Sequence, residues 1–408
     1  MAANPTIADR LVVVLSDIEM GAGGVLDDFP QSAFLGELIL AYNRPPFRDL
    51  AVDLVFNGDT FDLLKTPLDG AYPRRVTEEI AVAKLHRVIE AHGDFFEALR
   101  QFLGHPEAER RVHFVVGNHD LELVFPQVRG VVAAQAGGQQ VHFPGFAFDL
   151  GDLHVEHGAQ VDPMFAVDTE RPLMTHEGEQ ILALPWGSDA LLEVAIPLQH
   201  VLYDLDRLKP RRQVFELLPE VRDFLMGKFW RYWTRDYWRE LLSRNDPVKR
   251  VSWTLLKEVA YRFGTLDTSV AEGAEFRRML TESDRYAVIL LGHQHQPGWW
   301  SFGDRKLLHT GCFRDEFMMD AAGNVQRLIP KTYAEVYLRG DRVVRSHLVE
   351  VDGPIPPPGH APRSVFDVLP RVRPLLETPS ERAAIAAAHA EQEAKEAGGS
   401  DEPPPKSS

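Results

Sequence analysis

Five short blocks of the sequence combine Asp, Glu, Asn and His, side chains that commonly bind divalent cations. In chain order the blocks span residues 16–19, 57–62, 117–120, 156–158 and 292–295, and they read SDIE, NGDTFD, GNHD, EHG and GHQH. Carboxylates gathered at one place repel one another unless cations neutralise them, and mixed oxygen and imidazole ligands suit Mn, Fe, Zn or Co. If the fold brings the blocks together, the sequence predicts a metal site.

Each block directly follows a short apolar run, and these runs span residues 11–15, 54–56, 112–116, 153–155 and 287–291. Continuous aliphatic runs of this length are typical of strands in a sheet that is covered on both faces. Segments with helical periodicity, at residues 32–42 and 76–102, separate the first three runs. This order predicts parallel strands in an α/β core, with the five blocks converging at the carboxyl ends of the strands.

The rest of the chain predicts an insertion and two tails. Residues 188–265 have helical periodicity and many aromatic side chains, which indicates a helical cap insertion. Residues 332–338 and 342–349 flank a glycine turn and predict a hairpin. The predicted division has four parts. Residues 1–9 form an N-terminal tail, residues 10–187 and 266–352 form the core in two pieces, and residues 188–265 form the cap. Residues 353–408 form a Pro-rich and Ala/Glu-rich tail that is partly disordered.

Composition limits the classes of partner. The chain has 408 residues, a formal net charge of -16 and 44% hydrophobic residues, which is typical of a globular protein and argues against non-specific nucleic acid binding. The single cysteine, Cys312, excludes an internal disulfide and is expected to be a small buried residue. Because no apolar stretch reaches the roughly 20 residues of a membrane span, we expect a cytoplasmic protein, with peripheral membrane contact left open.

The order of the blocks resembles the calcineurin-like metallophosphoesterase family, whose motifs run D-x-H, G-D-x-x-D, G-N-H-D/E, a lone His and G-H-x-H. Counterparts of all five lie between Asp17 and His295. The resemblance implies a hydrolase that cleaves a phosphate ester or pyrophosphate bond with a water held between two divalent cations. Mn is the preferred metal, and Mg, Fe, Zn or Co are alternatives. Together with the strand order, it implies a four-layer αββα sandwich of two mixed sheets, with the helical cap over the strand ends.

The same resemblance implies roles for the block residues. Asp59 would bridge both metals, and the other ligands would be Asp17 and His295 at the first position and Asn118, His157 and His293 at the second. His119 would lie outside the ligand set as general acid or transition-state stabiliser, oriented by Asp62. His154 precedes His157 by three residues in the same strand; His157 is preferred because it ends the strand.

One residue departs from the family pattern. Glu19 stands where the first motif has histidine. As a ligand it would add a negative charge and shift the first position toward harder ions such as Mn or Mg. The alternative is that Glu19 points elsewhere, which leads to a second functional hypothesis, a metal- or lipid-binding pseudoenzyme with weakened catalysis. The intact pair of His119 and Asp62 favours the enzyme.

The predicted cap contains an aromatic and basic segment, residues 229–239, which reads FWRYWTRDYWR. On a helix Trp230 shares one face with other aromatic rings, while Arg231 and Arg235 share another. This arrangement suits a lipid phosphate substrate or an anionic membrane, and the alternative is an aromatic core with solvated arginines. The position of the insertion is similar to that in UDP-2,3-diacylglucosamine pyrophosphatases, which implies a lipid-linked substrate; a nucleotide remains an alternative.

Overall fold

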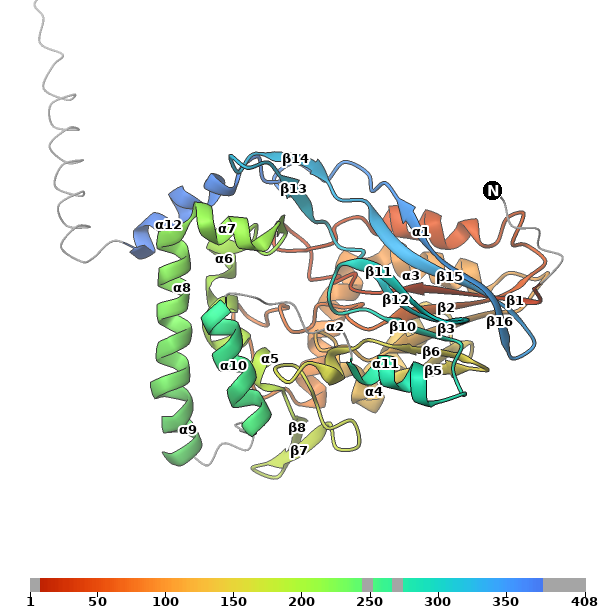
Figure 1. Ribbon diagram of the computed structural model, residues 1–408, viewed down its shortest axis with the longest axis horizontal. Coiled ribbons are helices and arrows are strands. Elements are labelled where there is room, and N and C mark those ends of the chain that lie inside the picture. The colour runs from red at the N-terminus through yellow and green to blue at the C-terminus, as the bar shows by residue number, and fades with distance from the viewer. Residues whose placement is uncertain (1–7, 244–251, 266–273, 377–408) are drawn as a thin grey trace, which may run out of the picture.

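The computed structural model describes residues 8–243, 252–265 and 274–376, and it has two mixed β-sheets with helices beside them (Figure 1). The larger sheet has the order β16-β15-β1-β2-β3-β4, and its strands span Arg342–Val351, Lys331–Arg339, Arg10–Leu15, Ala51–Asn57, Arg110–Val115 and Val141–Gly145. The strands β1 to β4 run parallel, whereas β15 and β16 are antiparallel to their neighbours. The predicted α/β class is therefore confirmed, and β15 with β16 forms the predicted hairpin.

The smaller sheet has the order β11-β12-β10-β6-β5, and its strands span Pro297–Phe302, Arg305–Thr310, Val288–Leu291, Leu153–Glu156 and Ala147–Leu150. The pairs of β10 with β6 and β12 are parallel, and the two edge strands are antiparallel. All five predicted apolar runs thus lie in strands, three in the larger sheet and two in the smaller one.

Apolar side chains from both sheets meet in one cluster. Val12, Val14 and Val55 of the larger sheet belong to the same buried cluster as Val155 and Leu290 of the smaller sheet. The alternate residues of β1 and β2 pack on the other side, in the cluster that contains helices α1 (Ser32–Ala41), α2 (Glu78–Ala91), α3 (Gly93–Leu103) and α4 (Pro126–Ala136). Helix α11 (Ala274–Glu282) covers the outer face of the smaller sheet. Burial on both faces is why these strands read as continuous apolar runs.

Two details of the predicted elements differ from the structure. The helix predicted over residues 76–102 is two helices, because the backbone at His92 leaves the helical conformation, with φ -119° and ψ 37°. The described part of residues 188–265 is mainly helical but also contains the short strand β9 (Leu208–Lys209), which pairs with β13 (Phe317–Met319) beside β14 (Val325–Leu328). The helical region is therefore joined to the later part of the chain by sheet pairing.

The helical region contains α5, α6, α7, α8, α9 and α10, which span Trp186–Ala190, Gln199–Leu202, Arg211–Leu217, Pro219–Arg231, Tyr237–Ser243 and Trp253–Thr265. Helix α12 (Leu369–Leu376), from the predicted tail, packs against α8 and β13 through Val372, beside Val368 of the 3-10 turn that precedes it. The Ala/Glu-rich part of the predicted tail lies outside the described residues. Within the described chain, no helix combines the length and the apolar character needed to cross a bilayer.

Arg110, at the start of β3, is a buried guanidinium that holds several chain segments together. It donates hydrogen bonds to the carbonyl oxygens of Tyr42 and Leu50, at 3.0 and 2.6 Å, and to Asn43 Oδ1 at 2.8 Å. The neighbouring Arg111 pairs instead with Glu109 at the surface. These two neighbouring arginines therefore differ in environment, since Arg110 is buried and Arg111 is at the surface, and their substitutions can be compared directly.

We expect Arg110→Met to lower the free energy of unfolding by about 3 kcal/mol or more, because each stranded buried acceptor costs roughly 1–3 kcal/mol. The control Arg111→Met should cost less than about 1 kcal/mol, as is usual for an exposed ion pair. Urea denaturation of both variants checks the difference. Equal losses of stability would show that the buried contacts of Arg110 do not stabilise the fold.

Candidate metal centre

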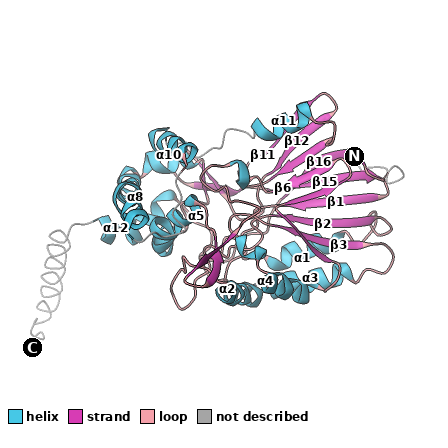
Figure 2. Cartoon of the chain, turned by 90° about the horizontal axis from the view of Figure 1, so that it is seen from below, coloured by secondary structure: helices cyan, strands magenta, loops and turns pink. Residues whose placement is uncertain are grey.

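The loops that follow the strands lie between the sheets and the helical region (Figure 2). Contacts between the loops of the smaller sheet and residues of the larger sheet hold these loops in place. The backbone amide of His293 donates to both carboxylate oxygens of Asp17, at 3.2 and 3.0 Å, and His157 Nδ1 lies 2.9 Å from the carbonyl oxygen of Asn57. The structure therefore brings together blocks that are separated by up to 276 residues.

The backbone is in the left-handed region at five residues of the predicted site. Their φ angles are 53°, 54°, 50°, 69° and 59° at Asp17, Glu19, Asp59, His293 and His295. A non-glycine residue rarely adopts this conformation, and strained positions of this kind cluster at functional sites. The strand ends are thus bent so that the next side chain turns back toward a common centre.

Two glycines allow the loops to approach closely. A Cβ atom at Gly117 would lie 2.1 Å from Asp59 Oδ1, and one at Gly292 would lie 1.9 Å from Ser16 Oγ. Neither position could carry a side chain without moving these residues. The glycines of the GNHD and GHQH blocks are therefore required by packing around Asp17 and Asp59.

The ligands predicted for the second metal position have a suitable spacing. His157 Nε2 lies 3.2 Å from Asp59 Oδ2 and 3.2 Å from Asn118 Oδ1. Two atoms that bind one ion at about 2.0–2.2 Å lie roughly 3.0–3.5 Å apart at ordinary coordination angles. His293 stacks edge-on to His157, and because its Nε2 contacts Asp162 at 3.1 Å, Nδ1 is the ring nitrogen left for an ion.

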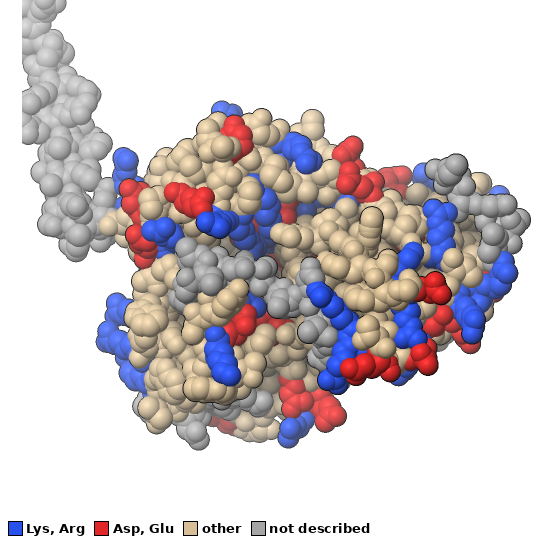
Figure 3. Space-filling model, in the orientation of Figure 1, with Lys and Arg blue, Asp and Glu red and all other residues tan. Residues whose placement is uncertain are grey.

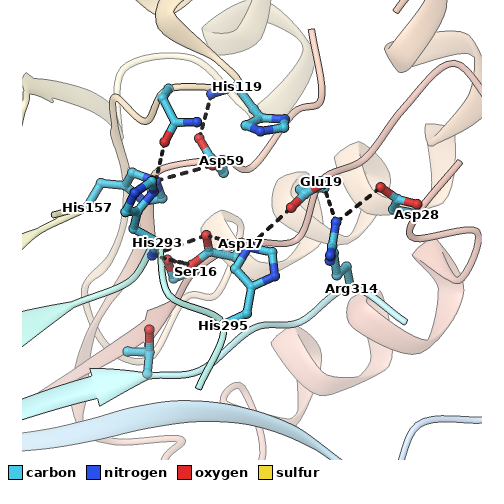
Figure 4. A network of polar contacts seen from close by, with 12 residues as sticks. Ser16, Asp17, Glu19, Asp28, Asp59, His119, His157, His293, His295 and Arg314 are labelled. Carbon is cyan, nitrogen blue, oxygen red and sulfur yellow. Dashed lines mark hydrogen bonds and ion pairs between the residues drawn. The ribbon is translucent and has the colours of Figure 1, made fainter. Parts of the chain in front are cut away.

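The residues predicted for the first position show the same spacing. His295 Nε2 lies 3.3 Å from Asp17 Oδ1 and 3.4 Å from Glu19 Oε1 (Figure 4). The other ring nitrogen of His295 contacts Glu316 Oε1 at 3.0 Å, and a carboxylate in this place fixes the ring for metal binding. Glu19 is therefore turned toward the predicted ligands rather than away from them.

Asp59 lies between the two groups. One atom each of Asp17, Asp59 and His157 fall within 4.8 Å of one another, and all three side chains are buried. The bridging role of Asp59 stays a prediction, and this placement is consistent with it. His154, the rival of His157, contacts Asp149 and Glu156 instead.

His119 is held by two carboxylates. Its backbone amide donates to Asp59 Oδ1 at 2.7 Å, and its ring Nδ1 lies 2.9 Å from Asp62 Oδ1. Burial lowers the pKa of His119, but the charges of Asp59 and Asp62 outweigh it and raise the pKa to about 9. In the metal-free protein the imidazole is thus held in place and protonated at neutral pH, the form from which a general acid gives up its proton.

The structure adds two cations that the sequence motifs do not contain, the buried Arg314 and the largely buried Lys65. Lys65 and Arg314 contact Glu19 Oε2, at 2.9 and 3.0 Å. Burial alone would raise the pKa of Glu19, but Arg314 and Lys65 hold it well below its usual range. Lys65 could have been noticed from the sequence as a residue close to the site, because it follows Asp62 of the second block by three residues. Arg314 could not, because it lies outside every block.

Arg231 and Arg235, predicted to bind substrate, are exposed side chains of the helical region. They sit at the end of α8 and in the π-helical turn Tyr232–Asp236, and each contacts Asp236 at the limit of an ion pair, 4.0 and 3.9 Å. Helix α10 lies between α8 and the sheets in Figure 1. Their role in substrate binding stays a prediction.

Metal binding should displace a proton from His157. Burial lowers the pKa of this imidazole, but Asp59 and Asp17 outweigh that effect and raise the pKa to about 10 in the metal-free protein. A histidine must be neutral to bind a metal, so we expect proton release on addition of Mn²⁺ at about pH 8. Calorimetry in two buffers with different ionisation enthalpies measures it. His157→Asn should release fewer protons, and identical heats for the native protein in both buffers would contradict the expectation.

Comparisons with known proteins give weak likenesses. No family model and no curated protein matches the chain. A dimetal phosphatase from Danio rerio is 12% identical, with 85% of this chain and 100% of that chain covered and a TM-score of 0.32. Vps29 complexed with Zn²⁺ from Entamoeba histolytica is 9% identical, with 83% and 98% covered and a TM-score of 0.26. Likenesses at this level do not bear on the function of this chain.

Proposed function

We propose that the protein is a metal-dependent phosphoesterase that hydrolyses a phosphate ester or pyrophosphate bond at a centre of two divalent cations. The observation that carries the proposal is the spacing of ligand atoms on both sides of Asp59, together with His119 beside them. We further infer an αββα layer order, with the two sheets sharing the cluster around Val14 and Leu290. We also infer a cytoplasmic location.

The residues fit two divalent cations. Asp17, Glu19 and His295 would hold one ion, Asn118, His157 and His293 the other, and Asp59 would be shared. When bound, the ions would neutralise charge on the phosphoryl oxygens and acidify a water nucleophile. The ligand set contains carboxylate oxygens, one amide oxygen and imidazoles, which suits Mn²⁺ first and leaves Mg, Fe, Zn or Co as alternatives.

His119 supplies the proton chemistry of the proposed reaction. Because Asp62 holds Nδ1, the proton on Nε2 is the one that can pass to the leaving oxygen. Asp62 lies in turn 2.8 Å from Lys65 Nζ, so its carboxylate cannot rotate freely. This chain of contacts orients the imidazole, and a protonated ring would also stabilise negative charge in the transition state.

We expect Asp59→Asn and His119→Ala to separate metal binding from catalysis. Asp59→Asn removes the shared charge and should abolish metal occupancy at both positions. His119→Ala should keep both ions and lose about 10²- to 10⁴-fold in turnover, the usual contribution of a general acid. Elemental analysis and hydrolysis of phosphomonoester, phosphodiester and pyrophosphate substrates measure both effects. Full activity in either variant would be incompatible with the proposed roles.

The second functional hypothesis, a pseudoenzyme, predicts a different result in the same assays. Such a protein would bind metal, and its turnover of every substrate would be unaffected by His119→Ala. The contacts of His119 with Asp59 and Asp62 favour the enzyme, because a protein that only binds metal has no use for a protonated imidazole outside the ligand set.

We also propose that the exposed face of α8 and the following turn contacts an amphiphilic phosphate substrate or an anionic membrane. Basic side chains gather at the left edge of Figure 3, where Figure 1 has α8 and α9. Trp230 is 60% exposed, and the side chains of Arg231 and Arg235 are 66% and 60% exposed. An exposed ring beside arginines is typical of an interfacial surface. Tyr232 and Tyr237 are buried in the helical region, so only part of the aromatic segment is available.

Replacing Arg231 and Arg235 together by Gln should raise KM for a lipid phosphate and leave KM for a small chromogenic phosphodiester unchanged. The reason is that only the lipid substrate is large enough to reach a surface beyond the centre. The matched control replaces Arg44 and Arg212, two exposed arginines elsewhere, by Gln. Equal effects on both substrates, or none, would leave the arginine face with a structural role.

A further inference from the structure

The two carboxylate oxygens of Glu19 face different surroundings. Oε1 is 3.4 Å from His295 Nε2, on the side of the predicted metal position. Oε2 receives Lys65 Nζ at 2.9 Å and Arg314 Nη1 at 3.0 Å. Figure 4 shows Glu19 between His295 and Arg314, with Asp28 on the far side of the guanidinium. One oxygen is therefore held by cations while the other is turned toward the centre.

The two cations are themselves fixed in place. The Arg314 side chain is 2% exposed and also contacts Asp206 Oδ2 and Glu316 Oε1, each at 3.1 Å. Lys65 Nζ also contacts Asp62 Oδ2 at 2.8 Å and forms an ion pair with Asp28. Because each cation is anchored by other carboxylates, neither can turn away without leaving buried charges unpaired, which would destabilise the fold strongly.

A carboxylate in this place needs such partners more than a histidine would. Glu19 is 1% exposed, and the carboxylates of Asp17, Asp59 and Asp62 are buried nearby. Without Lys65 and Arg314, Glu19 would be repelled by these carboxylates. Both of its oxygens would then turn toward whichever cation lay nearest. Two cations on the same oxygen offset the charge and fix the rotation of the group, so Oε1 stays available.

We propose that Lys65 and Arg314 are positioning residues of the first metal position, which hold Oε2 of Glu19 so that Oε1 can bind the ion. The inference rests on the proposed function, since it assigns Glu19 as a ligand. Lys65 also acts on the proposed general acid, because its ammonium contacts Asp62, the partner of His119. One side chain thus ties the first metal position to the general acid.

A double-mutant cycle on Mn²⁺ binding tests the proposal. The full-length protein, Lys65→Met, Glu19→Gln and the double variant are titrated with Mn²⁺ by calorimetry, and bound metal is counted by elemental analysis. Each single variant should keep one tight ion and bind the second about 10- to 100-fold more weakly, as is typical when a partner of a metal ligand is lost. The double variant should be no worse than Glu19→Gln, because Lys65 acts through Glu19.

Lys84→Met is the matched control, since Lys84 is also enclosed, with its side chain 1% exposed against 13% for Lys65, and pairs with Glu122 at 2.9 Å without touching Glu19 or Asp62. It should bind two ions as the native protein does. If Lys65→Met does not fold, the double variant Lys65→Met with Asp28→Asn replaces it, because it removes one charge of each sign. This variant should fold and show the same loss of Mn²⁺ affinity at the first metal position.

Unchanged Mn²⁺ binding in the Lys65 variant, or losses that add in the double variant, would overturn the inference. A native protein that binds no Mn²⁺ or other divalent cation would instead overturn the proposed function. Lys65→Arg supplies a further readout, because it restores a cation beside Glu19 and should recover at least part of the lost affinity. No recovery, with the protein folded, would also count against the positioning role.

Discussion

The buried negative charge at the strand ends is the constraint on which the rest of the site depends. Asp17, Glu19, Asp59 and Asp62 are each at most 2% exposed, and they are drawn together by the loops that follow β1 and β2. Carboxylates this close destabilise the fold unless positive charge lies among them. Lys65 and Arg314 supply that charge on one side of the cluster, and the protonated histidines or bound cations supply it on the other.

The fold imposes this arrangement through backbone geometry. The left-handed ligand residues follow β1, β2 and β10, and each of these strands is hydrogen-bonded on both sides, so it cannot relax to relieve the turn that follows. The strain at Asp17, Asp59 and His293 is therefore held by two sheets that pack through a common apolar cluster. Rigid strands and bent ends together place imidazoles and carboxylates within 3.2–3.4 Å of one another.

Much of the fold was predictable, because apolar runs and motifs can be recognised from residues that are neighbours in the sequence. The strands around Val13, Leu54 and Leu290 follow from hydrophobicity alone, and the convergence of Asp59 and His157 follows from the rule for strand ends. Contacts between distant residues were not predictable in this way. Nothing near Arg314 in the sequence indicates that it reaches Glu19, 295 residues away, and the pairing of β9 with β13 rests on two residues that carry no strand signal.

The amide of His293 and the carboxylate of Asp17 come from different sheets and from opposite parts of the chain. An ion bound to residues of both blocks would act as a cross-link between the two sheets, comparable in its effect to a disulfide that closes a very long loop. Separation of the two sheets during unfolding would then require release of the ion. The metal would thus set the lifetime of the folded chain against proteolysis as well as its chemistry, and chelation would shorten that lifetime even in the absence of substrate.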